Sequence, residues 1–217
     1  MKLFNANLSP YASRVRIAIY AKNLPIELVS PPGGTGTPEY KKLNPTGKVP
    51  ALEVDGLVIP ESEVINEYLE DRFPTPALRP ADPAARAHMR LLSRFADLYL
   101  APSLGALFGQ MNPKTRDAKL VAEKLAELAQ RLDQLEQLVV AGPYAAGADL
   151  TLADCALGPV FFFLTRLLPA LGAPSPLEGR PKLARVGEAV GKHAAVSKVL
   201  SEMGTAMAER FGGGAPS

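Results

Sequence analysis

The chain has a single cysteine, Cys155, among its 217 residues. One cysteine excludes an internal disulfide framework and suits a reducing compartment. There is also no Cys-x-x-Cys pair, which argues against disulfide exchange. The two histidines, His88 and His193, are far apart in the sequence and have no ligand-like companions, so we expect no metal site.

Strong net charge is also missing. The chain carries 24 Lys and Arg against 22 Asp and Glu, and a net charge of +2 is too small to argue for nucleic acid or an anionic membrane as a partner.

Long apolar runs are missing too. Lys2 is followed by none, which argues against a secretory signal, and the run from Val160 to Leu164 ends at Thr165, well short of a membrane span. We therefore expect a cytoplasmic protein.

The sequence changes character once along its length. Residues up to about 73 alternate short strand patterns with helices, whereas residues after about 83 have helical periodicity throughout. Prolines between Phe73 and Pro83 mark a linker between these halves. The sequence therefore predicts two domains, residues 1–76 and residues 83–217.

In the first half, the sequence pattern predicts secondary-structure elements in the order β-α-β, loop, β-β-α. A right-handed β-α-β unit followed by a hairpin and a covering helix is typical of a thioredoxin-like domain. Asp55-Gly56 is the hairpin turn signal, and the last helix begins at Glu61-Ser62. We expect that helix to bury one apolar face, formed by Val64, Ile65, Tyr68 and Leu69. The expected elements are strand Lys2–Asn7, helix Tyr11–Lys22, strand Ile26–Val29, loop 31–36, and strands Ala51–Val54 and Leu57–Ile59.

The second half predicts an all-helical domain. Thr151-x-x-Asp154 is a capping box at the start of one of its helices. Cys155 follows that cap and is expected to be a buried small hydrophobe. The expected helices are Ala84–Gln110 with a bend near Pro102, Thr115–Val140, Thr151–Leu168, and one or two between Pro181 and Phe211, before a frayed tail at Gly212–Ser217.

The segment from Asn44 to Glu70 is typical of a ligand clamp. A cis Val49-Pro50 bond would turn the backbone N–H and C=O of Val49 away from a neighbouring strand. Ser62, at a helix start, lies beside free N–H groups and the positive end of the helix dipole, where a carboxylate binds well. Gly47-Lys48 is not the end of a phosphate-binding loop, because Lys42 and Val49 stand where that motif needs glycine and Ser or Thr.

These motifs together resemble the cytosolic glutathione S-transferases of the serine type. The Val-Pro turn and the Glu61-Ser62 pair are similar to the glutathione-binding elements of that family. The opening from Ser9 to Ala18 resembles the tau and zeta classes of bacteria and plants, and Thr151–Asp154 resembles the family's capping box. The absence of cysteine at residues 9–11 argues against the cysteine-based omega and beta classes. The resemblance implies a cytoplasmic detoxification enzyme with glutathione as cosubstrate and no metal.

The resemblance implies a role for each site residue. Ser9, near the N-terminus of the first helix, would donate a hydrogen bond to the glutathione thiolate and lower the pKa of its thiol. Tyr11 and Ser13 are alternative hydroxyls. Tyr11 is expected to line the second-substrate pocket or to pack in the core, and Ser13 to be an exposed polar position. Glutathione would be held by Lys48, Val49, Glu61 and Ser62.

A second-substrate pocket is expected between the halves, where ligand sites are common. Its candidate walls are apolar, which suggests a hydrophobic electrophile; the alternative for each residue is helix-bundle core. They are Leu8, Tyr11, Tyr99, Leu107, Phe108 and Met111, with one ring from Phe161 to Phe163.

We interpret the chain as a glutathione transferase that activates the glutathione thiolate for attack on a hydrophobic electrophile. Three alternatives stay open: a zeta-like isomerase of maleylacetoacetate or maleylpyruvate, a glutathione-dependent lyase or dehalogenase of aromatic compounds, and a non-catalytic binding module. The zeta pattern has Ser-Ser-Cys where this chain has Ser9-Pro10-Tyr11, so the isomerase ranks lower. We also expect a homodimer, because the helix from Ala84 carries apolar residues on more than one side.

Overall fold

The computed structural model describes residues 1–211, so the tail predicted at Gly212–Ser217 lies outside the described residues. The chain divides into two compact units, Met1–Leu78 with His193–Ser217, and Arg79–Lys192. The last helix, α9 (Ala194–Phe211), therefore packs with the N-terminal part of the chain. The domain boundary between residues 76 and 83 stays a prediction.

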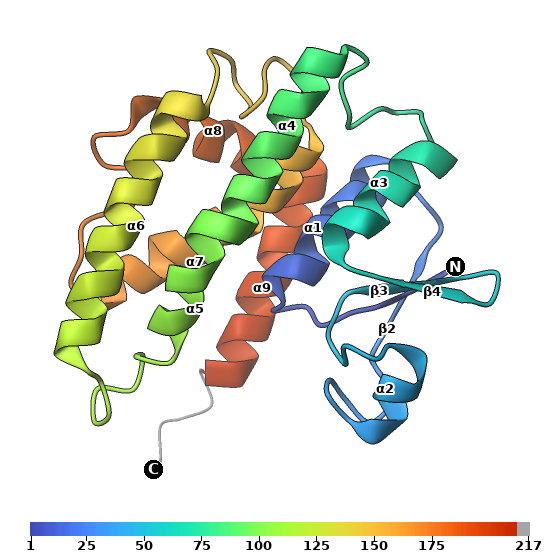
Figure 1. Ribbon diagram of the computed structural model, residues 1–217, viewed down its shortest axis with the longest axis horizontal. Coiled ribbons are helices and arrows are strands. Elements are labelled where there is room, and N and C mark those ends of the chain that lie inside the picture. Colours follow the sequence, from blue (N-terminus) through green and yellow to red (C-terminus); the bar gives the residue numbers. More distant parts are fainter. Residues whose placement is uncertain (212–217) are drawn as a thin grey trace. The chain divides into compact units, whose positions relative to one another are not determined.

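The first unit is built on one four-stranded sheet of order β2-β1-β3-β4. Figure 1 labels three of its strands, β2, β3 and β4. β1 is parallel to β2 and antiparallel to β3, and β3 and β4 form a hairpin. This arrangement confirms the predicted thioredoxin-like fold. The strands are β1 (Lys2–Phe4), β2 (Glu27–Val29), β3 (Ala51–Val54) and β4 (Leu57–Pro60); the helices are α1 (Pro10–Ala21), α2 (Pro38–Leu43) and α3 (Ser62–Arg72).

The hairpin turn forms where the sequence predicted it. Asp55 and Gly56 have φ of 49° and 80°, the left-handed backbone that a two-residue hairpin turn requires. The first unit's core lies between the sheet and its helices, where α1 contributes Val15 and Ile19 and α3 contributes Ile65 and Leu69. Each of these four side chains is at most 2% exposed.

The prediction for the first unit was incomplete at α2 and too long at β1. Thr37 caps α2 by accepting a hydrogen bond from the Tyr40 N–H at 3.2 Å, and Pro38 follows as its first residue. Cap and proline are helix-start signals that were present in the sequence. β1 ends at Phe4 and not at Asn7, because the chain turns where the Ser9 N–H bonds the Ala6 carbonyl at 2.9 Å.

Two side-chain placements were predicted wrongly. Val64 is 54% exposed, because the buried face of α3 carries Ile65 and Leu69, and a neighbouring residue points about 100° away from Ile65. Ser13 is buried and not exposed. Its Oγ accepts a hydrogen bond from Arg16 Nη2 at 2.8 Å, which satisfies the buried hydroxyl.

The second unit consists of helices among the described residues. The predicted long helix from Ala84 is interrupted by a π-helical turn at Ala96–Leu100, in which the Ala101 N–H bonds the Ala96 carbonyl. The turn precedes Pro102, which has no N–H to continue a regular α-helix. The helices are α4 (Pro83–Phe95), α5 (Ala101–Phe108), α6 (Ala118–Leu138), α7 (Leu152–Ala170) and α8 (Pro181–Lys192).

The helix α7 is the core of this unit. The predicted capping box is present at Thr151 and Asp154, and Cys155 is buried as expected. By length and composition alone α7 could cross a membrane, contrary to the expectation that no apolar run reaches that length. However, 83% of its apolar window is buried within the protein, as in the core helix of a globular protein.

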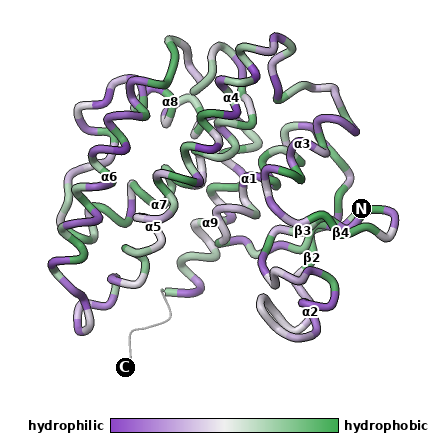
Figure 2. Tube along the Cα trace, in the orientation of Figure 1, coloured by the Kyte–Doolittle hydropathy of each residue, from purple (hydrophilic) through white to green (hydrophobic). Residues whose placement is uncertain are grey.

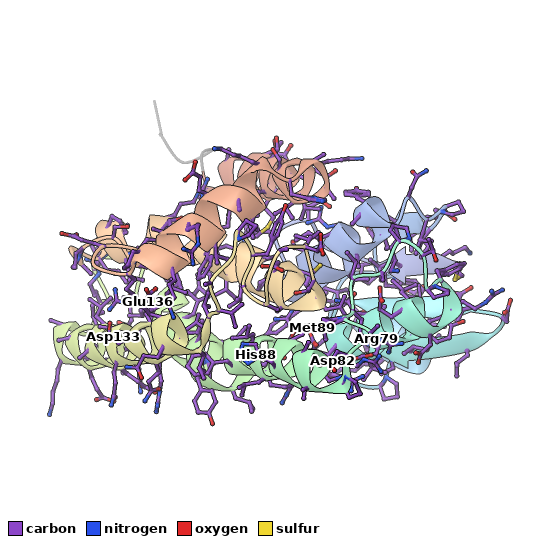
Figure 3. All side chains as sticks on the ribbon, turned by 90° about the horizontal axis from the view of Figure 1, so that it is seen from above. Arg79, Asp82, His88, Met89, Asp133 and Glu136 are labelled. Atoms are coloured by element: carbon purple, nitrogen blue, oxygen red, sulfur yellow. The ribbon has the colours of Figure 1, made fainter. Side chains whose placement is uncertain are left out.

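The helix α6 packs through one apolar stripe, and its tube alternates between polar and apolar colours (Figure 2). Its buried positions are Val121, Leu128, Leu132 and Leu135. On another side of α6, Glu136 accepts hydrogen bonds from the N–H groups of Lys182 and Leu183, both at 2.9 Å (Figure 3). A side chain from α6 therefore satisfies the N-terminal donors of α8.

Candidate functional site

The strand register gathers the predicted site segments at one end of the sheet. Phe4, the last residue of β1, pairs with Ala51, the first residue of β3, and Ala51 pairs with Pro60, the last residue of β4. The chain leaves this end toward Ser9, returns to it through Val49-Pro50 and leaves it again at Glu61. Three segments that are distant in sequence therefore meet at one edge of the first unit.

Ser9 is the N-cap of α1 and is half-buried. Its Oγ accepts a hydrogen bond from the Ala12 N–H at 3.2 Å. A hydroxyl has one donor besides its acceptor lone pairs, so the Ser9 O–H can still donate to a ligand. Ser9 can therefore cap α1 and donate a hydrogen bond to a sulfur anion at the same time.

The Val49-Pro50 bond is cis, as the clamp reading of the sequence proposed. The preceding Lys48 carbonyl accepts from Tyr40 Oη at 3.0 Å and from Asn44 Nδ2 at 2.8 Å. Burial raises the pKa of Tyr40, so its hydroxyl stays protonated and donates. Within residues 1–211 we find no hydrogen bond to the N–H or C=O of Val49. These two groups are therefore available to an extended ligand.

Glu61 and Ser62 lie at the N-terminus of α3. Glu61 has φ of 69° and makes no side-chain cap, and Ser62 is the first helical residue and only 5% exposed. Because Glu61 does not cap the helix, the first amides of α3 and the Ser62 hydroxyl can receive a carboxylate. The exposed Glu61 carboxylate suits an ammonium group.

The starts of α1 and α3 lie side by side. Arg14 in α1 forms an ion pair with Glu63 in α3, with 3.1 Å between Nη1 and Oε1, and the Arg14 side chain is 1% exposed. The positive ends of two helix dipoles therefore face the same edge of the sheet. Neither Arg14 nor the support of Lys48 by Tyr40 and Asn44 was predicted from the sequence. The run Asn44-Pro45, which favours a turn, was the available signal for this support.

The remaining predicted site residues are exposed or half-buried. Lys48 is exposed, Leu8 is half-buried, and Tyr11 is 41% exposed with the Arg14 guanidinium carbon 5.2 Å from its ring centroid. In the second unit, Tyr99, Phe108 and Met111 are 41%, 39% and 38% exposed. These side chains are accessible enough to line a pocket, and the second-substrate pocket itself stays a prediction.

Four of the candidate wall residues are buried in the core. Leu107 is fully buried, so it does not line an open pocket in the second unit. The rings of Phe161, Phe162 and Phe163 are also at most 5% exposed. Phe163 packs edge-on against Phe108, with 5.0 Å between the ring centroids, which explains its burial.

Metal-ligating side chains do not cluster in the part of the chain that the structure describes. No group of three His, Cys, Asp or Glu residues there could hold a metal ion. His88 lies on α4; of the acids labelled with it, Asp82 is the N-cap of α4, and Asp133 and Glu136 belong to α6 (Figure 3). Asp133 is paired with Arg180, at 2.8 Å between oxygen and nitrogen.

The sequence matches two family models. Residues 3–77 match the glutathione S-transferase N-terminal domain, and residues 95–190 match the glutathione S-transferase C-terminal domain. The maleylacetoacetate isomerase of Pseudomonas aeruginosa is 33% identical over 203 residues, which cover 90% of this chain and 93% of that protein.

Solved structures agree with this match. A bacterial maleyl pyruvate isomerase, described as a zeta-class glutathione S-transferase, has a TM-score of 0.75 and 29% identity over 92% of this chain and 96% of its own. A glutathione S-transferase from Methylobacterium radiotolerans in complex with glutathione sulfonate has a TM-score of 0.76 and 27% identity over 92% and 93%. The chain is an enzyme of the glutathione S-transferase family, with a thioredoxin-like N-terminal domain, a helical C-terminal domain and a zeta-like sequence.

Proposed function

We propose that the chain is a glutathione transferase in which Ser9 stabilises the thiolate of bound glutathione. The thiol loses its proton to solvent, and the Ser9 O–H donates a hydrogen bond to the sulfur anion. The positive ends of α1 and α3 lower the pKa of the thiol further. The sulfur then attacks a hydrophobic electrophile, forming a carbon–sulfur bond as the leaving group departs or the double bond accepts a proton.

The tripeptide would lie along the edge that carries the other site residues. The backbone of Val49 would pair with the extended peptide, and Ser62 with the first α3 amides would bind the γ-glutamyl carboxylate. Glu61 would bind the γ-glutamyl ammonium, and Lys48 would approach the glycyl carboxylate. Leu8, Tyr11, Tyr99, Phe108 and Met111 are the residues we propose for the electrophile.

One observation carries this proposal: the pairing of Phe4 with Ala51, and of Ala51 with Pro60, brings Ser9, Val49 and Ser62 to one edge of the sheet. Calorimetric titration with glutathione tests it. We expect saturable binding to one site per chain, and weaker binding of a peptide that lacks the γ-glutamyl carboxylate. Absence of binding by both peptides would contradict the proposal.

A glutathione-dependent isomerase is the second candidate. The relatives that favour it are the maleylacetoacetate isomerase at 33% identity and the maleyl pyruvate isomerase at 29%. In this reaction the thiolate adds to the cis double bond and leaves again after rotation, so glutathione is regenerated. Assays with maleylpyruvate and with an activated chloronitrobenzene separate the two activities. Isomerisation of maleylpyruvate regenerates glutathione, whereas transfer to chloronitrobenzene consumes it.

We further propose that the enzyme is a cytoplasmic homodimer. Leu91, Leu98 and Tyr99 are 44%, 55% and 41% exposed, although they are large and apolar. Leu91 and Tyr99 border a surface groove of about 410 Å³ beside α4 and α6, which Phe95, Arg131, Gln134, Gln137 and Leu138 also line. A second copy of the chain would cover this apolar face. Light scattering checks this: the chain mass is 23.1 kDa, and a mass of about twice that supports the dimer.

A further inference from the structure

The loop that carries Ser9, residues 5–9, is held by a fully buried arginine. The Arg16 side chain is 0% exposed. Its Nη2 donates to the Asn7 carbonyl at 2.7 Å, and its Nη1 donates to Asn7 Oδ1 at 3.3 Å. Asn7 lies two residues before Ser9, and the turn between them is closed by the bond from the Ser9 N–H to the Ala6 carbonyl. Arg16 therefore fixes the backbone from which Ser9 projects.

The charge of Arg16 is balanced from the far end of the sequence. Arg16 Nη1 pairs with Glu202 Oε2, and Glu202 lies on α9, 186 residues later. Glu202 Oε1 also accepts from Tyr20 Oη at 3.1 Å, so the carboxylate is held by two side chains of α1. Helices α1 and α9 belong to the same compact unit and lie side by side (Figure 1).

A buried ion pair of this kind is a costly way to join two helices. Desolvation of both charges costs several kcal/mol, and a hydrophobic pair of similar volume often stabilises the fold as well. The guanidinium, however, offers a planar set of donors, and here it reaches Asn7, Ser13 and Glu202 at once. An apolar side chain would pack α1 against α9 but would not donate to the Asn7 carbonyl, so it would not hold this loop.

We propose that Arg16 is a positioning residue for thiol activation, and that Glu202 on α9 holds it in place. In this account α9 completes the glutathione-activating unit by fixing the direction of the Ser9 hydroxyl, although it contributes no group to the ligand. The inference rests on the proposed role of Ser9.

The test compares two substitutions on α9. Glu202→Gln removes the counter-charge of Arg16 but keeps the side-chain shape. Lys198→Ala is the matched control, because Lys198 Nζ lies 3.9 Å from the ring centroid of Tyr20 and so also contacts α1. The partners of Arg16 are instead Asn7, Ser13 and Glu202. The measurements are turnover, the KM for glutathione, and the titration of the bound thiolate by its ultraviolet absorbance.

We expect Glu202→Gln to raise the pKa of bound glutathione by about one unit, which corresponds to a tenfold loss of thiolate well below that pKa. Turnover near neutral pH should fall with it, while the KM for glutathione changes little, because Ser62 and Val49 are untouched. Lys198→Ala should leave the pKa unchanged. If Glu202→Gln titrates like Lys198→Ala, the inference is overturned.

Two further variants keep the result interpretable. If Glu202→Gln does not fold, the double variant Arg16→Met, Glu202→Leu carries the same test, since it leaves no unpaired buried charge. Ser9→Ala separates the inference from the function on which it rests. If the thiolate pKa shifts in Ser9→Ala but not in the Arg16 and Glu202 variants, the positioning role of Arg16 is wrong and the role of Ser9 stands. If the pKa shifts in none of these variants, the proposed role of Ser9 is wrong.

Discussion

The two compact units differ in what they bury. Among the described residues, the first unit buries several charged or amide side chains, whereas the second buries one carboxylate, Asp154, and a few hydroxyls. Those in the first unit include Asn5, Arg14, Arg16, Lys22, Asn44, Asn66 and Glu70. Several of them hold the loops that present Ser9 and Val49. The second unit is instead held by apolar packing around α7.

This difference matches the different roles that we propose for the two units. Buried polar side chains cost free energy unless they are paired, and they fix one geometry when they are. The unit proposed to bind and activate glutathione therefore carries the residues that fix backbone positions. The second unit, proposed to accept varied apolar electrophiles, needs shape more than hydrogen bonding. The predictions below test this contrast.

The largest effect is expected at the buried pair of Lys22 and Glu70. Lys22 Nζ lies 2.7 Å from Glu70 Oε1 and also donates to the Phe73 carbonyl at 2.7 Å. Lys22→Met leaves a buried carboxylate without its cation, which should lower the free energy of unfolding by about 3–5 kcal/mol. Chemical denaturation measures this. A loss below about 1 kcal/mol, the range of exposed ion pairs, would contradict our reading of the first unit.

A somewhat smaller loss is expected at the one buried carboxylate of the second unit. Asp154 accepts from the N–H groups of Ala145 and Thr151, both at 2.8 Å, and from the Thr151 hydroxyl. Asp154→Ala should destabilise the protein by about 2–4 kcal/mol, since a cap is lost and buried N–H groups stay unpaired.

Asp82→Ala is the control for that measurement. Asp82 caps α4 through a single exposed bond to the Ala85 N–H at 2.7 Å, so its loss should cost about 1 kcal/mol. Equal losses in the two variants would show that burial of Asp154 adds nothing. Glutathione affinity of the folded protein should be unchanged in both.

A still smaller effect is expected at Ser62, and it falls on binding. Ser62→Ala should raise the dissociation constant of glutathione about tenfold, because a hydrogen bond to a charged group is worth roughly 1.5–3 kcal/mol. Calorimetric titration measures the change, and Val64→Ala, at an exposed position of the same helix turn, is the control. A Ser62→Ala protein that titrates like the parent would remove Ser62 from the site.

Local signals made parts of both units predictable. The Asp55-Gly56 turn, the Ser9 position at the start of α1 and the Thr151 capping box each depend on residues close in sequence. The roles that family resemblance gave to Lys48, Val49, Glu61 and Ser62 stay predictions, although the register brings their segments to one edge.

The features that the sequence did not predict depend on distant partners. An arginine in an amphipathic helix is usually exposed, but Arg16 is buried and paired with Glu202. The two residues are 186 positions apart in the sequence, so no local pattern predicts their pairing. Likewise, the exposure of Val64 and the burial of Ser13 depend on which neighbours α3 and α1 meet. Helical periodicity identifies an apolar face but not the partner that fills it.

The most direct test of the account is the titration of the bound thiolate in the parent and in Ser9→Ala, with the ultraviolet absorbance of the thiolate as readout. Loss of the hydroxyl should raise the pKa of bound glutathione by about 1–2 units, since a hydrogen bond to a charged group is worth roughly 1.5–3 kcal/mol and each unit corresponds to 1.36 kcal/mol. The dissociation constant of glutathione should change far less. An unchanged thiolate pKa in Ser9→Ala would contradict the account and shift thiol activation to Tyr11 or to the backbone amides of α1.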